Sequence, residues 1–496
     1  MTAGSAARAA AEVPADFVKA MTLTDATMLA AGSMIGSGIF IVSADIARIL
    51  GSPLLLLAVW TLTGIMTLLG ALAYGEMAAM YPHAGGQYVF LREAMGPLPG
   101  FLYGWTLFLI IQTGTIAAVA VAFARFLGVL WPASAPELFA WFPHVDFATP
   151  GGAITLGLSP QRLIALAMVW TLTAVNLRGV REGKLVQTSL TFVKTAVLVA
   201  LVVLGLAVGR NAGAVAANFG AGRFAGPIDW SGAFVIAFGS AMVGALFSTD
   251  AWNNVTFAAA EVRDASRNLP RALLYGTLLV TGLYVLVNLA YLSLLPLHGA
   301  AGGADVAARG IQWATQDRVG TAAAEVLFGA AGVTVMAAAI LVSTFGCNNG
   351  LILSGARVYY AMAKDGLFFR RVGALSARKV PAAALVAQAA WTSVLCLTGT
   401  YSQLLDYVIF AALLFYALTT AGLFLLRRKA PDVARPYRAV GYPALPALYL
   451  ALAATVCVIL LLADKTRTQA LGGLVLVLVG IPVFYLWRGR AAMAAA

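Results

Sequence analysis

The sequence predicts an all-α polytopic membrane protein with about twelve transmembrane helices. Of its 496 residues, 61% are hydrophobic and 10% are charged, and a water-soluble protein of this size does not tolerate so apolar a surface. Apolar runs of about 20 residues or more also recur from Leu23 to Trp487, and each is long enough to cross a hydrocarbon layer about 30 Å thick. The solvent around most of this chain is therefore expected to be lipid.

The apolar runs show no strand alternation, so each is predicted as a helix that satisfies its backbone hydrogen bonds internally. The connections are short, except for residues 131–160 and 296–319, which are expected outside the cell. No separate soluble domain is expected. The predicted spans are residues 23–49, 54–80, 97–130, 161–177, 186–208, 230–259, 270–295, 320–360, 381–398, 403–426, 445–463 and 470–487.

The distribution of the net charge of +12 argues against nucleic acid as a partner. Nucleic-acid binding needs basic residues on one soluble face or arm, whereas here they lie in short segments between apolar runs. With a cytoplasmic N-terminus, about two thirds of the 32 lysines and arginines fall on inner segments, as the positive-inside rule requires. Both termini are therefore predicted in the cytoplasm, and Glu12 and Asp16 argue against a signal peptide before the first span.

Several function classes lack the residues that they need. No Gly-rich phosphate loop followed by Lys and Ser or Thr is present, so an ATP-driven pump is not expected and energy must come from gradients or exchange. An enzyme is not predicted, because His83, His144 and His298 fall in loops far apart and no nucleophile and base share a common depth. The three cysteines lie within apolar runs and are interpreted as packed small residues. We expect no cofactor and no metal.

The first span contains the segment GSMIGSG at residues 32–38, in the middle of the membrane. Such a run is a poor helix interior. One interpretation is close helix packing through a small-xxx-small pair of glycines. The other is an unwound break. A break would direct the N–H groups of Gly36, Ser37 and Gly38 toward an anion such as a carboxylate, and the carbonyls near Met34 toward an ammonium.

The sixth span contains a second interruption, FSTDAWNN at residues 247–254, with one acidic residue and two amides inside an apolar run. Polar groups at that depth are expensive unless they are used or paired. Interruptions in the first and sixth spans are what an inverted repeat of five plus five helices predicts, because the corresponding elements of the two halves meet at the midplane.

Five segments make a family resemblance specific. Together they resemble the amino acid–polyamine–organocation (APC) superfamily, and within it the L-type amino acid transporters and their prokaryotic relatives. The similarity runs in order from about residue 22 to about residue 445. It implies the LeuT-like fold, a five-plus-five inverted repeat with broken helices 1 and 6 and two further C-terminal helices. The segments are Gly32 to Phe40 (GSMIGSGIF), Gly51-Ser52-Pro53, Gly85-Gly86-Gln87-Tyr88, Phe247 to Asn253 and Asn268-Leu269-Pro270.

The resemblance implies roles for the residues at both breaks. In such permeases the α-carboxylate of the substrate binds backbone N–H groups of the first break, which here are those of Gly36, Ser37 and Gly38. The α-ammonium is held by backbone carbonyls of both breaks, here around Met34, Phe247 and Asp250. The ring of Phe247 also resembles the gate that covers the substrate from outside.

Two side chains of the second break each have two possible roles. The carboxylate of Asp250 either contacts the substrate, where it could read a cationic side chain, or pairs internally. Asn253 matches a position that lines the side-chain pocket in relatives, but an asparagine there could equally form a helix–helix hydrogen bond.

Lys194 lies on the fifth span about two turns from its cytoplasmic end, so it could extend to the interface. It coincides, however, with the family's lysine whose ammonium replaces a sodium ion of sodium-coupled cousins. A fixed ammonium there would link the first span to the eighth and repel sodium. The same lysine could take up and release a proton. The proposed neighbours of the ammonium on the eighth span are Ser343, Thr344, Cys347 and Asn349.

Two charged residues are expected at inner ends of spans. Glu76 is predicted to pair with an inner-loop arginine, and Arg357 either pairs with a carboxylate or extends to the interface. The expected organisation is a cytoplasmic N-terminal tail (1–21), a first five-helix repeat (22–209), an outer loop (210–229), a second five-helix repeat (230–426), helices 11 and 12 (427–488) and a cytoplasmic C-terminal tail (489–496).

The resulting hypothesis is a secondary active amino acid transporter of the plasma or inner membrane that works by alternating access. It predicts sodium-independent exchange or proton-coupled uptake of neutral L-amino acids, with the lipid bilayer as surroundings. Alternatives are a cationic amino acid or polyamine transporter, and an amino acid sensor without transport. Eukaryotic L-type relatives are disulfide-linked to a glycoprotein through a cysteine in the loop after the third helix. Residues 131–160 contain no cysteine, so no obligatory subunit of that kind is expected.

Overall fold

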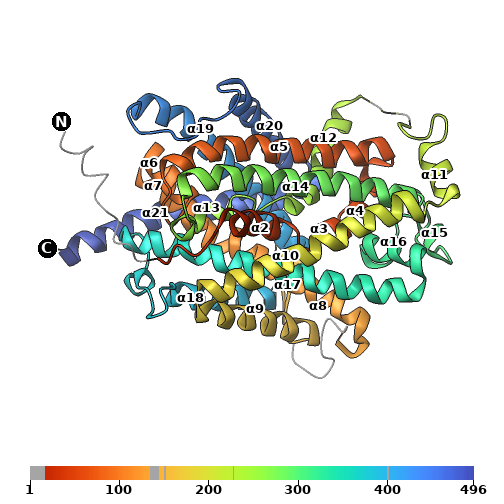
Figure 1. Cartoon of the computed structure of the whole chain (residues 1–496), viewed down its shortest axis with the longest axis horizontal. Helices are drawn as coiled ribbons and strands as arrows, with labels where there is room; N and C mark the ends of the chain where they lie inside the picture. Colours follow the sequence, from red (N-terminus) through yellow and green to blue (C-terminus); the bar gives the residue numbers. More distant parts are fainter. Residues whose placement is uncertain are drawn as a thin grey trace.

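The computed structural model describes residues 17–134, 145–149, 152–226, 228, 230–398 and 401–495. They form a bundle whose long helices run roughly along the longest axis of the molecule (Figure 1). Among the described residues, nine helical segments are long and apolar enough to cross a membrane. The helices α9 (Pro160–Arg178), α12 (Gly232–Ser248) and α18 (Ala382–Thr398) bring the set to the predicted number of about twelve. The predicted fold class is confirmed.

The first half of the chain contains the first five spans. The first span is split into three helices, and the third contains a π-helical turn. The elements are α2 (Leu23–Met34), α3 (Gly38–Ile41), α4 (Ser43–Leu50), α5 (Pro53–Met80), α6 (Gln87–Met95), α7 (Pro97–Thr106), η2 (Leu107–Ile111), α8 (Gln112–Leu130), η3 (Pro132–Ser134), α9, α10 (Val180–Val203) and η4 (Leu204–Val208).

The second half contains the remaining spans and the outer segments between them. After α12 the elements are α13 (Asn254–Phe257), η5 (Ala259–Glu261), α14 (Ala265–Leu294), α15 (Val306–Arg309), η6 (Thr315–Asp317), α16 (Val319–Phe328), α17 (Ala330–Lys364), η7 (Arg370–Gly373), α18, α19 (Tyr401–Lys429), α20 (Ala444–Leu462) and α21 (Asp464–Ala495). The short helix α11 (Ala212–Phe219) lies between η4 and α12.

Local sequence sets the ends of the first two spans. The side chain of Thr22 accepts a hydrogen bond from the N–H of Asp25, whose carboxylate accepts one from the N–H of Thr22, so a capping box starts α2. Gly51 ends α4 with a left-handed φ of 58°, which favours glycine. Ser52 then caps α5, whose first residue is Pro53. Two residues therefore suffice to end one span and begin the next.

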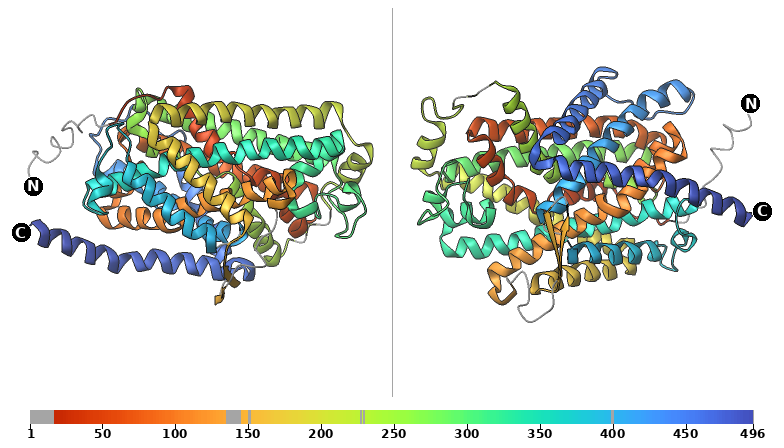
Figure 2. Two further views of the ribbon diagram at one scale, coloured as in Figure 1. Left: turned by 90° about the horizontal axis from the view of Figure 1, so that it is seen from below. Right: turned by 180° about the vertical axis from the view of Figure 1, so that it is seen from behind.

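The predicted span 320–360 is wrong as a single helix. It consists of α16 and α17, which are separated by Gly329 with a φ of 60°, a backbone conformation that favours glycine. The predicted last span, 470–487, is too short, because α21 runs from Asp464 to Ala495. Figure 2 shows this helix along one side of the bundle, with its C-terminal turns projecting beyond it.

The outer connection between the third and fourth spans contains a short hairpin that the apolar pattern does not reveal. The strands β1 (Val145–Thr149) and β2 (Gly152–Leu156) pair antiparallel, with Val145 opposite Leu156 and Thr149 opposite Gly152. The amphipathic helix α6 was also not predicted, since its nine residues are too few for a span.

The two interrupted spans lie side by side in the centre of the bundle (Figure 1). α2 packs against α10, α14 and α17, α3 packs against α12, and α13 contacts both α2 and α17. The interruptions therefore lie among packed helices rather than facing lipid. This placement is the one that allows non-helical backbone at membrane depth.

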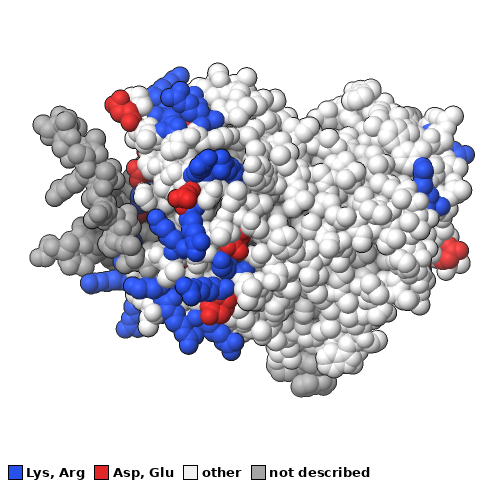
Figure 3. Space-filling model, in the orientation of Figure 1, with Lys and Arg blue, Asp and Glu red and all other residues white. Residues whose placement is uncertain are grey.

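On the face shown in Figure 3, charged residues lie at the two ends of the molecule and leave an uncharged belt between them. Lysines and arginines are concentrated at the end where α21 finishes, while few are visible at the opposite end. An apolar belt flanked by charged ends is the pattern of a protein that spans a bilayer.

Candidate functional site at the two helix breaks

The first span is unwound where the sequence predicts it. α2 ends at Met34, and Ile35 has a ψ of 89°, outside the helical region. Helical geometry resumes with α3 at Gly38 and continues through Val42 into α4. The break therefore comprises Ile35, Gly36 and Ser37, and it directs the carbonyl end of α2 and the amide end of α3 toward the same region. The interpretation as a break is confirmed.

The second interruption is also present. α12 ends at Ser248 and α13 begins at Asn254, so residues 249–253 are not helical. Ala251 has a φ of 64°, which is uncommon for a residue with a side chain. The unwound segment therefore includes Asp250, as predicted.

The two breaks contact each other directly. A Cβ atom at Gly38 would lie 3.1 Å from the Cα atom of Ser248, and its nearest neighbour would be the Ser248 hydroxyl. The start of α3 therefore touches the end of α12 through a position that has room only for glycine. In addition, the hydroxyl of Tyr284 on α14 donates to the carbonyl of Met34 at 3.1 Å and to that of Ser248 at 3.2 Å. Tyr284 thus joins the carbonyl ends of α2 and α12.

Lys194 lies inside the bundle and does not extend to the interface. Its side chain is only 1% exposed, and its ammonium donates to the carbonyls of Gly32 at 2.5 Å and Ile35 at 2.8 Å at the end of α2. The carbonyl of Ser343 on α17 lies 3.5 Å away. The predicted link between the first and eighth spans is confirmed, and the positive charge lies at a helix C-terminus, where the helix dipole favours it.

Two of the four proposed neighbours of the Lys194 ammonium are correct. The Ser343 hydroxyl donates to the carbonyls of Ile35 and Gly36, both at 3.2 Å, and Cys347 donates to the carbonyl of Ser33 at 3.0 Å. The hydrogen bonds of the other two go to other partners. Thr344 donates to its own helix at Ile340, and Asn349 donates to Gly183 and Gln187.

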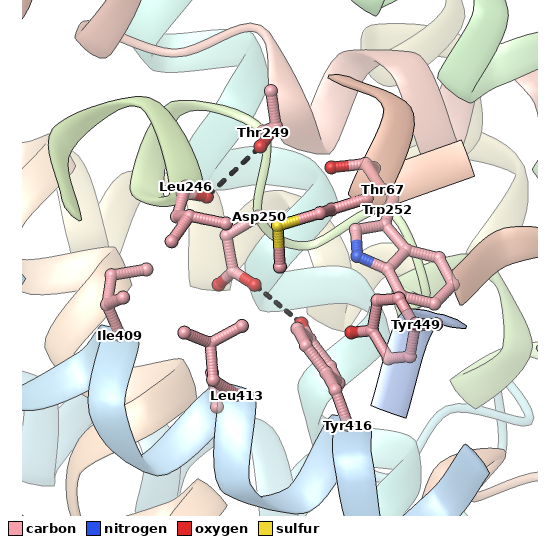
Figure 4. A pocket seen from close by; sticks show the side chains of 11 residues that line it. Thr67, Leu246, Thr249, Asp250, Trp252, Ile409, Leu413, Tyr416 and Tyr449 are labelled. Carbon is pink, nitrogen blue, oxygen red and sulfur yellow. Dashed lines mark hydrogen bonds between the residues drawn. The ribbon is translucent and has the colours of Figure 1, made fainter. Parts of the chain in front are cut away.

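The Asp250 carboxylate pairs internally in this structure. It is buried, and the hydroxyl of Tyr416 on α19 donates to it at 2.5 Å (Figure 4). It also points toward a cavity of about 20 Å³, which has room for one water molecule. The lining residues are Met66, Thr67, Leu246, Thr249, Asp250, Trp252, Ile409, Ala412, Leu413, Tyr416 and Tyr449.

Asn253 takes part in a polar chain that runs between helices. Its side-chain amide donates to Gln87 at 2.7 Å, and its oxygen lies 3.4 Å from the Tyr416 hydroxyl. Gln87 in turn donates to Thr419 at 3.0 Å. In this structure the asparagine therefore makes the helix–helix hydrogen bonds of the second alternative. Phe247, the penultimate residue of α12, is buried.

Sequence reasoning missed Gln87, Tyr284 and Tyr416. Gln87 belongs to the motif Gly85-Gly86-Gln87-Tyr88 but had no role assigned. The two tyrosines lie in the middle of apolar spans, where a hydroxyl needs a buried partner. A tyrosine far from either interface was the signal that could have found them.

Ion pairs join α5 to α19 and α17 to η5. The carboxylate of Glu76, fully buried, binds Arg427 of α19 at 2.6 Å and Arg435 of the following loop at 3.3 Å, so it pairs with arginine as predicted. Arg357 and Glu261 form a buried pair at 2.8 Å. The Arg357 guanidinium therefore pairs with a carboxylate, the first of its two alternatives.

The helix α6 is also tied to the end of α17. Asp365 accepts hydrogen bonds from Arg92 and, at 2.7 Å, from Tyr88. Although burial opposes the charge of Arg92, the carboxylates of Asp365 and Glu93 raise its pKa above the ordinary value. The guanidinium thus stays charged and connects two helices.

Separate contacts hold the end of α4. Arg48 at the end of α4 binds Asp317 at 2.6 Å and donates to the carbonyl of Gln312 at 2.8 Å. Gln312 donates to the carbonyl of Ala47 at 3.1 Å. The last turn of the first span is thereby attached to the long connection between α14 and α16.

No cofactor or metal enters this account. Within the described part of the chain, no group of three or more His, Cys, Asp and Glu side chains could hold a metal ion. The groups gathered at the breaks are backbone amides and carbonyls, hydroxyls, one ammonium and one carboxylate. Such a set can bind a small zwitterion without a cofactor.

Two interrupted helices that meet halfway through a bundle of about twelve spans define a secondary transporter. The chain belongs to the amino acid permease family, whose model matches residues 21–483. It is therefore a multi-pass membrane transporter with amino acids as substrates, and not an enzyme. The resemblance to the APC superfamily is confirmed.

Known transporters match nearly the whole chain. The chain is 29% identical over 478 residues to the serine/threonine exchanger SteT of Bacillus subtilis (strain 168), with 96% of this chain and 98% of SteT covered. It is 29% identical over 477 residues to the human large neutral amino acids transporter small subunit 2, with 94% of this chain and 80% of that protein covered. It is 25% identical over 474 residues to the human b(0,+)-type amino acid transporter 1, with 95% and 88% covered.

Proposed function

We propose that this permease moves neutral L-amino acids by alternating access, independently of sodium, through exchange or together with a proton. The observation that carries the proposal is the Lys194 ammonium bound to the carbonyls of Gly32 and Ile35. A fixed positive charge satisfies the carbonyl oxygens that a sodium ion would otherwise coordinate, and it repels a second cation. The similarity to a serine/threonine exchanger and to a large neutral amino acids transporter supports neutral substrates.

The proposed substrate site lies between the breaks. The N–H groups at Gly36, Ser37 and Gly38, at the amide end of α3, would bind the α-carboxylate. The carbonyls of Met34, Phe247 and Asp250 would hold the α-ammonium. The ring of Phe247 would cover the substrate from outside, and Asn253 would line the side-chain pocket once its bond to Gln87 opens.

The proposed orientation places the basic end of the molecule in the cytoplasm. That end carries the last turns of α21 and the helix α6 (Figure 1), whose Arg92 pairs with Asp365. Both termini would then be cytoplasmic, in the plasma or inner membrane. We further propose the repeat boundaries 22–209 and 230–426 and a transporter that works without a disulfide-linked glycoprotein.

Uptake into proteoliposomes tests the proposal. Vesicles preloaded with serine or leucine should take up the same labelled amino acid equally well in sodium chloride and in choline chloride. A requirement for sodium would contradict the proposed role of Lys194. Binding without uptake under any gradient would instead favour a sensor.

A cationic amino acid or polyamine transporter remains the second candidate, because Asp250 places a carboxylate at the second break. That function predicts that arginine, ornithine or putrescine competes with uptake, and that competition disappears in Asp250→Ala. The similarity to the b(0,+)-type transporter is the reason to include these compounds in the panel.

A further inference from the structure

The side chain of Asp250 faces away from the first break. The cavity beside its carboxylate is lined by residues of α5, α12, α19 and α20 and of the unwound segment after α12, and by none from α2, α3, α10 or α17. Figure 4 shows the carboxylate directed toward Leu413 and Tyr416 on α19. The backbone of Asp250 and its carboxylate can therefore serve different purposes, one at the substrate site and one behind it.

The carboxylate has no counter-ion among the described residues. Its hydrogen bonds come from the Tyr416 hydroxyl and the backbone N–H of Ala251. The titratable side chains that interact with it are all uncharged near neutral pH. They are Tyr74 on α5, Tyr103 on α7, Cys347 on α17, Tyr416 on α19 and Tyr449 on α20.

A buried carboxylate without a cation is unfavourable, so it must bind either a proton or a cationic ligand. The size of the cavity distinguishes these possibilities. About 20 Å³ is room for one water molecule, whereas the ammonium or guanidinium end of a substrate side chain with its methylene groups is several times larger. Aromatic and aliphatic side chains, including Trp252 and Leu413, form most of the wall. The site therefore fits a proton.

We propose that Asp250 is the proton-binding group of this transporter, with Tyr416 as the residue that positions its carboxylate. The inference rests on the proposed function and selects proton-coupled uptake from its two modes. In each cycle the carboxylate takes one proton from the outer water, becomes a neutral carboxylic acid and releases that proton to the inner water. Each neutral amino acid would then enter with one positive charge.

Asp250→Asn, which imitates the protonated acid, is the direct test in proteoliposomes. With one proton per substrate, a difference of about 1 pH unit, acidic outside, supports up to about a tenfold accumulation of labelled amino acid in the wild type. In Asp250→Asn the accumulation ratio should fall to about one, while counterflow remains measurable. The matched control is Asp464→Asn, because Asp464 is an exposed carboxylate at the start of α21 whose one ion pair among the described residues is with Arg467. This variant should accumulate substrate as the wild type does.

Tyr416→Phe provides a second readout that does not depend on the asparagine variant. Removing the donor leaves the carboxylate charge less stabilised, so the midpoint of uptake against outer pH should move upward by about 1 unit. An unchanged midpoint would overturn the proposal, as would accumulation in Asp250→Asn equal to wild type. Wild-type protein that carries out counterflow but accumulates no substrate in a pH gradient would overturn the proton site and leave the proposed exchange intact. Absence of both activities in the wild type would contradict the proposed function itself.

Discussion

The hydroxyl of Tyr284 lies 3.1 Å from the carbonyl oxygen of Met34, the last residue of α2. The same hydroxyl is 3.2 Å from the carbonyl of Ser248, the last residue of α12. One side chain of α14 thus connects the two interrupted spans at the depth where both lose their helical hydrogen bonds. Any movement of one break relative to the other must change this contact.

Tyr284→Phe should therefore reduce transport without unfolding the protein. The variant keeps the ring, which packs edge-on against Trp60, and removes only the hydroxyl. A hydrogen bond of this kind contributes about 1 kcal/mol, which corresponds to about a fivefold lower rate of counterflow. Counterflow at saturating substrate measures the effect, and a wild-type rate would show that the bridge between the breaks has no role in transport.

Gly38→Ala should abolish transport or reduce it at least tenfold, because the new methyl group overlaps Ser248 and separates the two breaks. Gly232→Ala is the control, since a Cβ atom at Gly232 meets nothing within 4 Å. Combining Gly38→Ala with Ser248→Gly removes the nearest overlapping atoms and should restore part of the activity. Equal rates for the single and double variants would rule out the steric explanation.

Arg48→Ala should make the site easier to reach from outside, because it frees the end of α4 from Asp317 and Gln312. A partly exposed pair with one additional hydrogen bond contributes about 1 kcal/mol, so the expected gain is severalfold. Cys347, buried beside the first break, reports the change through its labelling rate with a membrane-impermeant thiol reagent. The control variant Arg467→Ala removes an exposed ion pair, and its Cys347 should be labelled at the wild-type rate. The variant Cys347→Ser measures the background labelling of other cysteines.

Arg357→Met should destabilise the protein strongly, because it leaves the buried carboxylate of Glu261 without a cation. Breaking one side of such a pair costs about 3 to 5 kcal/mol. Thermal unfolding in detergent should therefore begin at a clearly lower temperature. The double variant Arg357→Met with Glu261→Leu should recover most of the loss, since both charges are gone. A double variant less stable than either single one would contradict this account.

Much of the fold follows from the sequence because lipid imposes simple requirements. Apolar runs of sufficient length must be helices, so nine of the twelve predicted spans agree with the structure to within five residues or the split expected at a break, and the span 186–208 begins six residues too late. The span 320–360 failed at Gly329, since a single glycine within an apolar run is compatible with both a continuous helix and a turn. The hairpin β1–β2 was not foreseen, because an outer connection in water is not bound by the same requirements.

Some features of the candidate site could be predicted from the sequence and others could not. The segments around Gly36 and Asp250 were recognisable because small or polar residues in the middle of a span weaken a helix locally, and local effects are visible in sequence. The alternatives for Lys194 and Asn253 could not be separated, since the reach of a long side chain and the partner of an amide depend on neighbouring helices. The same holds for Tyr284 and Tyr416, whose partners lie 250 and 166 residues away along the chain.

The sequence by itself therefore determined that the chain spans the membrane repeatedly, that its first and sixth spans are interrupted, and that it resembles amino acid permeases. Hydrophobicity and helix propensity depend on residues close together in the chain, so the sequence alone reveals them. Only the tertiary structure decided that the Lys194 ammonium binds the end of α2, that Tyr284 joins the two breaks and that the Asp250 carboxylate faces a separate cavity. Those contacts depend on how helices pack, and packing brings together residues that no local pattern connects.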